Sequence, residues 1–275
     1  ICMFKRTPSL LLALAAIAVV VAVISSSFKS VSESESASVS ESAPASESSD
    51  LSIQVMDEKV PQQLLKRIAY TASYNKDTRC PNWVYWNLTA DHIDGSCSRT
   101  NKFYADTDVP EPRADWRDFK GTGWSRGHMC PAGDCKWDEK AMYETFLLSN
   151  IVPQNPNLNQ GDWNELETMC RKWAKKFGNV HIVCGPLPYD KPWQTISNNK
   201  IVVPRALFKV VLCTTGTPKA IGFVYKNAPQ NNPKKYYVNS VRQVERLTGI
   251  DFFPALPDDI EENIETNVNA EEWGI

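Results

Sequence analysis

The feature that most constrains the fold is an apolar stripe between residues 161 and 177. Five apolar side chains recur there at steps of three and four: Trp163, Leu166, Cys170, Trp173 and Phe177. That spacing places them along one face of an α-helix, and Gly178 supplies a stop directly afterwards. Because such a helix buries one face only, it requires a second layer of structure to pack against.

Strand-prone segments can supply that second layer. They are rich in aromatic or β-branched residues and lie at 83–88, 179–184, 201–213 and 220–225. Two further helices are expected at 138–148 and 238–247. Because helices and strands do not alternate regularly along the chain, the sequence predicts an α+β layered domain and not a βαβ series.

The first residues differ in composition from the rest of the chain. Lys5 and Arg6 precede an uncharged apolar run from residue 10 to residue 24, and this order is typical of an export signal. Segment 1–24 is therefore predicted to be a signal peptide or a signal anchor, and in the second case residues 8–24 would hold the protein at a membrane. Both alternatives predict an extracytoplasmic body that is secreted, periplasmic or membrane-anchored.

Residues 25–53 are dominated by Ser, Glu, Ala and Val, which cannot bury enough apolar surface to offset chain entropy. They are expected to form a disordered linker, followed by the folded domain at 54–266 and an acidic tail at 267–275. Between residues 51 and 255 the chain has 27 basic and 20 acidic side chains. A modestly basic body suits an anionic ligand such as nucleic acid, although a solvated surface is the commoner explanation.

The chain contains eight cysteines, seven of them in the body. Together with the export-like start, this number favours an oxidising compartment and some disulfide bonds. Cys80 with Cys97 is the preferred pair, because it would close a loop around a turn-like segment. Cys130 with Cys135 is the alternative, although that bond would constrain the loop described next.

Only three histidines occur, and they differ in their surroundings. His181 lies in an alternating strand and is expected to be packed, whereas His92 lies in a polar, turn-like stretch and is expected at the surface. His128 belongs to the glycine-rich segment 121–134. In this segment the guanidinium of Arg126 can bind a phosphate through two hydrogen bonds, and His128 offers a base that titrates near neutral pH. From spacing alone, an ordinary glycine-rich turn explains this segment equally well.

A second polar segment lies at the entrance of the 161–177 helix. Asn159 precedes the helix, and Glu167 follows it by eight residues. An amide oxygen at a helix entrance and a carboxylate two turns further on can face one cleft. These hard oxygen donors suit a largely hydrated Mg²⁺ ion.

Taken together, segments 125–134, 148–154 and 158–167 resemble the DNA/RNA non-specific endonucleases, whose members include secreted bacterial nucleases and mitochondrial endonuclease G. Looser matches extend the resemblance over roughly 65–265. It implies the ββα-metal, or His-Me finger, fold with a mainly antiparallel central sheet flanked by helices. It also implies Mg²⁺-dependent hydrolysis of phosphodiester bonds in both DNA and RNA, bound through their phosphate backbone.

The resemblance also implies a role for each matching residue. His128 would be the general base that deprotonates the attacking water, and Asn150 a supporting residue in the site. Asn159 would bind Mg²⁺ directly and Glu167 would hold a metal-bound water, with Mn²⁺ as another cation that such a site accepts. Three cations would stabilise charge on the phosphate: Arg99, Arg126 and Arg171.

Two rival interpretations remain open, and the first rests on a departure from the family pattern. The family most often has Asp before Arg-Gly-His, whereas this chain has Ser125, which accepts a hydrogen bond but carries no charge. The first rival is a catalytically weak nucleic-acid-binding or interaction protein that retains the fold. The second is a zinc module built on His128, Cys130 and Cys135, which the absence of a second clear cysteine pair disfavours.

Overall fold

The computed structural model describes residues 53–187 and 191–275. The expected leader 1–24, its apolar run 8–24 and the Ser-rich segment up to residue 52 lie outside the described residues. Ile53, which was assigned to the linker, begins strand β1 (Ile53–Val55). Within the described part of the chain, no helix has the length and apolar character needed to cross a membrane.

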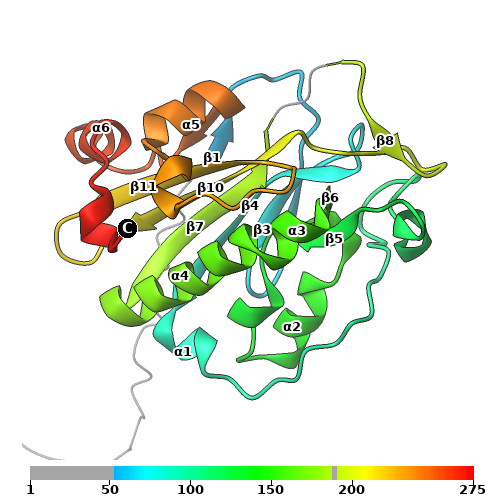
Figure 1. Ribbon diagram of the computed structural model, residues 1–275, viewed down its shortest axis with the longest axis horizontal. Coiled ribbons are helices and arrows are strands. Elements are labelled where there is room, and N and C mark those ends of the chain that lie inside the picture. Colours follow the sequence, from blue (N-terminus) through cyan, green and yellow to red (C-terminus); the bar gives the residue numbers. More distant parts are fainter. Residues whose placement is uncertain (1–52, 188–190) are drawn as a thin grey trace, which may run out of the picture. The chain divides into compact units, whose positions relative to one another are not determined.

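A seven-stranded sheet forms the centre of the domain (Figure 1), in the order β12-β11-β10-β7-β4-β3-β2. Every neighbouring pair is antiparallel, as expected from the resemblance. The strands are β2 Gln63–Lys66, β3 Thr71–Asn75, β4 Cys80–Thr89, β7 Asn179–Pro186, β10 Ala206–Cys213, β11 Lys219–Lys226 and β12 Val238–Asn239. The predicted 201–213 strand is split into β9 (Ile201–Val202) and β10, because Pro204 lies between them and has no N–H for a ladder.

Helices cover both faces of this sheet. The side chains of β10 alternate between two cores: Leu207, Val211 and Cys213 lie in the core beneath α4 (Asp162–Phe177), and Phe208, Val210 and Leu212 in the core beneath α5 (Val241–Thr248) and α6 (Asp258–Thr266). A central strand covered on both sides is apolar on both sides. The α+β prediction is therefore confirmed, with β10 among the innermost strands.

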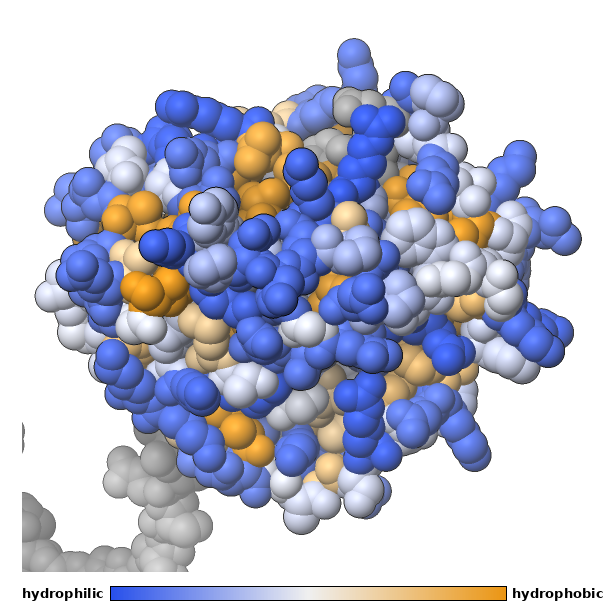
Figure 2. All heavy atoms as spheres, viewed as in Figure 1, coloured by the Kyte–Doolittle hydropathy of each residue, from blue (hydrophilic) through white to orange (hydrophobic). Residues whose placement is uncertain are grey.

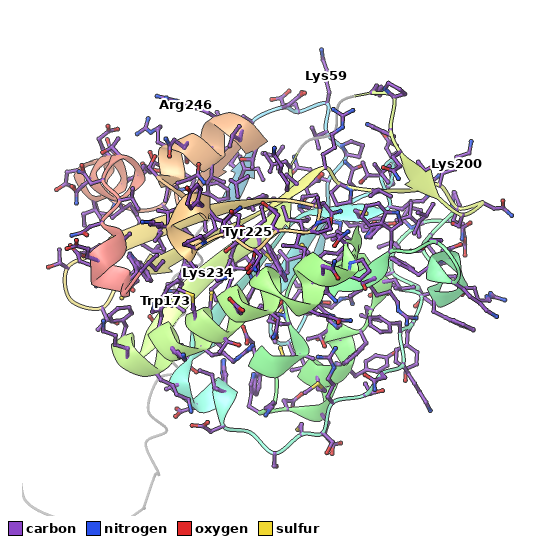
Figure 3. All side chains as sticks on the ribbon, viewed as in Figure 1. Lys59, Trp173, Lys200, Tyr225, Lys234 and Arg246 are labelled. Carbon is purple, nitrogen blue, oxygen red and sulfur yellow. The ribbon has the colours of Figure 1, made fainter. Side chains whose placement is uncertain are left out.

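Helix α4 matches the predicted apolar stripe closely. Trp163, Leu166, Cys170 and Trp173 are buried, and Gly178 ends the helix with φ +92°, donating its N–H to the Ala174 carbonyl. At the other end, Asp162 accepts hydrogen bonds from Lys234 Nζ and the Tyr237 hydroxyl, both at 2.9 Å. Figure 3 labels Lys234 and Tyr225, which contact the first turn of α4 through Asp162 and Trp163, and Trp173, which lies nearer the other end of the helix. The helix is thus fixed at its start and along its length.

The remaining elements are short. The predicted helices at 138–148 and 238–247 appear as α2 (Glu139–Thr145) and α5. A ribbon of β5 (Ser125–His128) and β6 (Ile151–Gln154) leads into α3 (Pro156–Gln160). The others are α1 Ala90–Ile93, β8 Thr195–Ile196, β13 Ile250–Phe252 and the 3₁₀ helices η1 Trp116–Phe119, η2 Ala132–Asp134, η3 Leu148–Asn150, η4 Lys234–Tyr237 and η5 Ala270–Trp273.

The last residues differ from the expected acidic tail. Trp273 is buried at 3% exposure, with its ring centroid 4.9 Å from that of Trp173. The Trp173 indole N–H donates to the Trp273 carbonyl at 2.8 Å. Residues 270–273 therefore pack against α4 as part of the domain. On the face drawn in Figure 2, the surface is mostly hydrophilic with scattered apolar patches.

The predicted disulfide bonds are wrong. Cys80 faces the core, where its Sγ donates to the Val202 carbonyl at 3.6 Å. Cys97 carries a free thiol on a loop whose backbone is tied to Lys136. The alternative pair, Cys130 and Cys135, has its sulfur atoms 3.8 Å apart, compared with about 2.05 Å for a bonded pair. Sequence separation alone does not determine which cysteine side chain faces the core.

Candidate active site

The β5–β6 ribbon and the two helices that follow it carry the predicted base and the two predicted metal ligands. His128 is the last residue of β5, Asn159 lies on α3, and Glu167 lies in the second turn of α4. Helix α3 packs against both β5 and α4. A histidine at the end of a β-ribbon, followed by helices that carry oxygen donors, is the arrangement of the ββα-metal class.

His128 lies between two aromatic rings. Its ring centroid is 5.4 Å from that of Phe103 and 5.0 Å from that of Phe146. Burial lowers the pKa of His128 to about 3, and the positive charges of Arg99 and Arg126 act in the same direction. The imidazole is therefore neutral at physiological pH. Its buried Nε2 has no hydrogen-bond partner among the described residues, so it is available to accept a proton.

Two predicted cations lie over the same aromatic rings. The guanidinium of Arg126 is 4.5 Å from the Phe103 centroid, and that of Arg99 is 5.7 Å from the Phe146 centroid. Cation–π contacts of this kind hold a guanidinium over a ring face. The structure thus brings Arg99, Arg126 and His128 together around Phe103 and Phe146, two residues that the sequence analysis missed.

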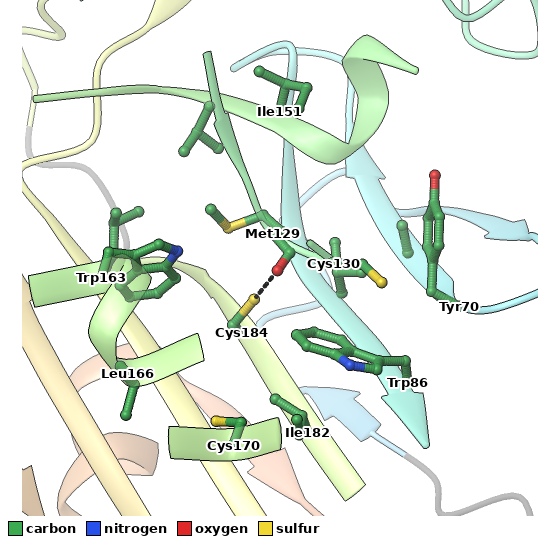
Figure 4. Close-up of a cluster of buried hydrophobic side chains, with 14 of the residues drawn as sticks. Tyr70, Trp86, Met129, Cys130, Ile151, Trp163, Leu166, Cys170, Ile182 and Cys184 are labelled. Atoms are coloured by element: carbon green, nitrogen blue, oxygen red, sulfur yellow. Dashed lines mark hydrogen bonds between the residues drawn. The ribbon is translucent and has the colours of Figure 1, made fainter. Parts of the chain in front are cut away.

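Asn150 is fully buried and clamps the chain that follows His128. Its Oδ1 accepts from the Cys130 N–H, and its Nδ2 donates to the carbonyls of Cys130 and Thr145, all at 2.9 Å. The Asn150 carbonyl also accepts from the Met129 N–H at 3.0 Å. Figure 4 shows a further tie, in which Cys184 Sγ on β7 donates to the Met129 carbonyl at 3.2 Å. These contacts support a positioning role for Asn150.

Position 127 requires a glycine because the side chain of Gln154, on the neighbouring strand, leaves no room for a Cβ. A Cβ at this position would lie 2.1 Å from Oε1 of Gln154 on β6, so a side chain there would collide with a fully buried residue. Glycines in such a segment let the backbone approach a ligand closely. At Gly127, the close approach is to Gln154 instead.

Arg171, the third predicted cation, is held by a buried carboxylate. Its Nη1 lies 2.9 Å from Asp134 Oδ1, and its Nη2 donates to Thr168 Oγ1 at 3.1 Å. Asp134 Oδ2 also accepts from the Trp86 indole N–H at 3.1 Å. Burial raises the pKa of Asp134 despite the nearby charge of Arg171. Asp134 lies within the recognised motif, yet no role for it was predicted from the sequence.

The pKa of Glu167 is influenced by a buried positive charge for which the sequence predicted no role. Burial raises the pKa of Glu167 to about 7, and among the charges that oppose this rise Lys209 is the largest, followed by Arg171 and Arg99. Lys209 is fully buried on β10, and its Nζ finds no hydrogen-bond partner within 53–187 and 191–275. A lysine inside the apolar run 206–213 was the available signal, because such strands rarely bury a charge without function.

The donor set of Asn159 and Glu167 fits a divalent cation. Amide and carboxylate oxygens are the ligands that hard cations prefer, and a bound cation would stabilise the carboxylate form that burial disfavours in Glu167. One other acidic group converges among the described residues: Glu245, Asp251 and Glu265 have ligand atoms within 4.8 Å of one another. Arg242 already pairs with Glu265 there at 2.6 Å, so no cation is assigned to that group.

The zinc alternative is not supported. His128, Cys130 and Cys135 do not appear among the converging metal-ligand groups of the described residues. Burial raises the pKa of the Cys130 thiol well above its usual range, whereas a zinc ligand must be a thiolate. The two other histidines also lie outside the site. His181 is packed on β7 with its Nδ1 3.0 Å from the Tyr85 hydroxyl, and His92 stacks on Trp137 at 4.5 Å.

Comparison with known proteins agrees with this class of site. Residues 47–259 match the DNA/RNA non-specific endonuclease family, and the chain belongs to that family. It is 42% identical over 205 residues to the mitochondrial nuclease EXOG of Danio rerio, covering 68% of this chain and 60% of that protein. Human mitochondrial endonuclease G is 33% identical over 208 residues, covering 70% of each chain.

A solved structure of the EndoG/EndoGI complex superimposes with a TM-score of 0.67 at 27% identity, covering 74% of this chain and 91% of that one. The predicted family and the ββα-metal fold are therefore confirmed. The chain spans less than two thirds of the length of the EXOG proteins that it matches.

The predicted extracytoplasmic location is wrong. Relatives from zebrafish, human and fission yeast are named as mitochondrial nucleases, which contradicts a secreted, periplasmic or membrane-anchored body. The prediction rested on a basic and apolar leader. Such a pattern indicates a targeting segment in general terms and does not by itself identify the compartment.

Proposed function

We propose that this protein is a divalent-metal-dependent endonuclease that hydrolyses phosphodiester bonds in DNA and RNA. The observation that carries the proposal is the neutral, unpartnered Nε2 of His128, buried between two aromatic rings and flanked by Arg99 and Arg126. Membership of the non-specific endonuclease family supports the same reaction class.

His128 acts as the general base. Burial lowers the pKa of His128, so the imidazole is uncharged at pH 7, and its unpartnered Nε2 is the atom that accepts a proton from the attacking water. Arg126 and Arg99 place positive charge beside the reacting phosphate and stabilise the negative transition state. Asn150 keeps the chain after His128 in place through its three side-chain hydrogen bonds.

Asn159 and Glu167 would hold the metal, Asn159 directly and Glu167 through a bound water. The chemistry that such a cation supplies is stabilisation of negative charge on the phosphate and the leaving oxygen. Mg²⁺ suits these oxygen donors, and Mn²⁺ is accepted by similar ones. Arg171 adds positive charge on the Asp134 side of the site.

The substrate is recognised through its phosphate backbone. The residues around His128 offer guanidinium groups and oxygen donors, which contact phosphates and metal and do not read base edges. Because the sugar is not selected by any of these groups, both DNA and RNA are substrates, with little dependence on sequence.

A cleavage assay tests the proposal. Supercoiled plasmid and structured RNA are incubated with the purified protein in Mg²⁺, in Mn²⁺ and in excess EDTA, and the products are separated on gels. We expect nicked and linear plasmid and RNA fragments with either metal, and intact substrates in EDTA. Substrates left intact under all conditions, but retarded in a binding gel, would favour the catalytically weak binding protein that Ser125 leaves open.

A further inference from the structure

A cavity of about 550 Å³ adjoins the proposed metal ligand Asn159. Its walls come from η1 and the loop after it, from β5, from α3 and from the segment before η1. The lining residues are Phe103, Trp116, Phe119, Lys120, Trp124, Ser125, Arg126 and Asn159. Half of these eight side chains are aromatic and two are cationic, which is the composition of sites that bind single-stranded nucleic acid.

Trp116 is the most unusual member of this wall. Of the nine tryptophans, all of which are described, only Trp116 falls among the exposed residues, at 48%. An indole left half in water lacks the burial that tryptophan normally gains on folding. Its large flat face is therefore available to a ligand.

The backbone that presents Trp116 is held firmly. Asp115 caps η1 by accepting from the Arg117 N–H at 3.0 Å, while Asp118 Oδ2 accepts from the Asp115 N–H at 2.6 Å. Asp118 also accepts from Asn199 Nδ2 at 2.9 Å. A platform that is fixed before binding loses little entropy when a ligand stacks on it.

The cavity shares wall residues with the proposed reaction site. Phe103 forms part of its wall and lies 5.4 Å from His128 between ring centroids, with the Arg126 guanidinium 4.5 Å above it. Asn159 forms another part of the wall. A nucleotide whose phosphate lies between His128 and Asn159 therefore has this cavity beside it, within reach of its own base or of the adjoining one.

We infer that this cavity is a stacking subsite for one unpaired base next to the scissile phosphate, with Trp116 as its platform and Lys120 and Arg126 as its phosphate contacts. The inference rests on the proposed function and specifies its substrate. In a duplex both faces of each base are already stacked, so a base must be extruded before it can enter. The subsite therefore favours single-stranded over double-stranded substrates.

The test measures binding by the metal-free protein, so that no cleavage is required. Fluorescence anisotropy in excess EDTA gives the Kd of a labelled single-stranded oligonucleotide and of the same strand made entirely of abasic sites. Trp116→Ala should weaken binding of the normal strand by at least about fivefold, the lower end of the range for loss of one stacked base. Its effect on the abasic strand should be less than twofold, and Trp116→Phe should restore most of the affinity.

Tyr236→Ala is the matched control. Tyr236 is an exposed aromatic residue, at 70%, that does not line this cavity, so its loss should leave both Kd values unchanged. Thermal unfolding of Trp116→Ala confirms that the half-exposed side chain is not needed for folding. A duplex of the same sequence should bind more weakly than the single strand, and Trp116→Ala should narrow that difference.

Three outcomes overturn the subsite: equal weakening of the normal and abasic strands, no weakening of either, or no binding of single strands by the parent protein. Failure of the proposed function has a different signature, which is absence of metal-dependent cleavage in the plasmid and RNA assay. If the protein binds single strands through Trp116 but cleaves neither DNA nor RNA, the stacking subsite is supported and the proposed nuclease function is rejected.

Discussion

The Nζ of Lys209 lies 4.6 Å from the centroid of the Trp163 ring, directly beneath the first turns of α4. It is also 5.3 Å from the Trp86 centroid. Figure 4 shows Trp163, Trp86, Cys170 and Cys184 around this part of the core. Burial acts to lower the pKa of Lys209, but the neighbouring Cys184, Cys170, Glu167 and Asp134 raise it overall. The lysine is therefore a buried ammonium whose charge is influenced by two carboxylates of the candidate site.

Replacement of Lys209 by Met should impair metal use. Lys209 is the largest influence that opposes the raised pKa of Glu167, so its loss moves that pKa further above 7 and leaves Glu167 protonated in more molecules at neutral pH. We expect the Mg²⁺ concentration for half-maximal activity to rise by about fivefold at pH 7 for a shift of one pKa unit, because the ionised fraction of Glu167 falls from about one half to about one eleventh. Activity measured across a Mg²⁺ titration at pH 7 and pH 8.5 tests this.

Lys219→Met is the control for that variant, because Lys219 lies on the neighbouring strand β11 and stacks on Phe177 away from Glu167. It should leave the Mg²⁺ requirement unchanged. If Lys209→Met raises the half-maximal Mg²⁺ concentration by the same factor at pH 8.5 as at pH 7, the effect arises from altered packing and not from the charge of Lys209.

The loss of activity on the acidic side of the pH profile, its acidic limb, should result from protonation of Glu167. Its pKa is about 7 because burial disfavours the carboxylate, so protonation removes the ligand as pH falls through 7. His128 stays neutral down to about pH 3 and remains a base throughout this range. Because the metal competes with the proton, raising Mg²⁺ should move the limb to lower pH. Rates measured from pH 5 to pH 9 at low and saturating Mg²⁺ give the comparison.

In the same experiment, Glu167→Gln should abolish the limb, since the amide does not titrate. A limb near pH 6.5 that is insensitive to Mg²⁺ would instead assign the titration to an ordinary histidine.

Removal of the base should separate catalysis from folding. His128→Ala should lower the cleavage rate by roughly 10² to 10⁴ without changing the Mg²⁺ dependence, because no metal ligand is lost. His181→Ala is the matched control: this buried histidine contacts Tyr85 outside the site. Its loss should reduce the free energy of unfolding by about 2 kcal/mol with normal turnover per folded molecule. Near-native turnover by folded His128→Ala would contradict the assigned role.

The metal ligands should differ in strength. Asn159→Ala removes a direct contact and should raise the half-maximal Mg²⁺ concentration more than Glu167→Ala, which acts through a water molecule; second-sphere contacts are commonly worth about 10- to 100-fold in affinity. Asn157→Ala is the control, because Asn157 is an exposed asparagine on the same short helix. An equal effect of Asn157→Ala and Asn159→Ala would show that α3 matters as a helix and not through its amide ligand.

Local patterns in the sequence predicted the parts of this fold that depend on local structure. The apolar stripe from Trp163 to Phe177 predicted α4, because helical periodicity depends on residues three and four apart in the sequence. The recognised motifs located His128, Asn159 and Glu167 on the ββα unit. The ion pair between Asp134 and Arg171 could not be predicted, because it joins residues 37 apart in the chain whose approach depends on how α4 packs on the sheet.

Dependence on the packing of distant segments also explains the wrongly predicted disulfide bond and the cavity residues that were not predicted. Cys80 and Cys97 are close in sequence, but the first faces the core and the second lies on a loop. The sequence predicted no role for Phe103 or Trp116, because their importance arises only when the fold places both in the wall of one cavity, with Phe103 beside His128.

The affinity for nucleic acid should fall steeply with salt, and one lysine should account for a measurable part of the slope. Each neutralised phosphate releases condensed counterions, which contributes about 0.7 to the slope of log Kd against log salt for a single strand. Lys120 is exposed at the edge of the cavity, so Lys120→Ala should reduce the slope by roughly that amount for every sequence tested. Kd values of the metal-free protein between about 50 and 200 mM salt provide the measurement. Lys59→Ala, at an exposed lysine outside the cavity, should keep the parental slope. An unchanged slope in Lys120→Ala would mean that Lys120 makes no phosphate contact, and the strand would then have to leave the cavity on the Arg126 side.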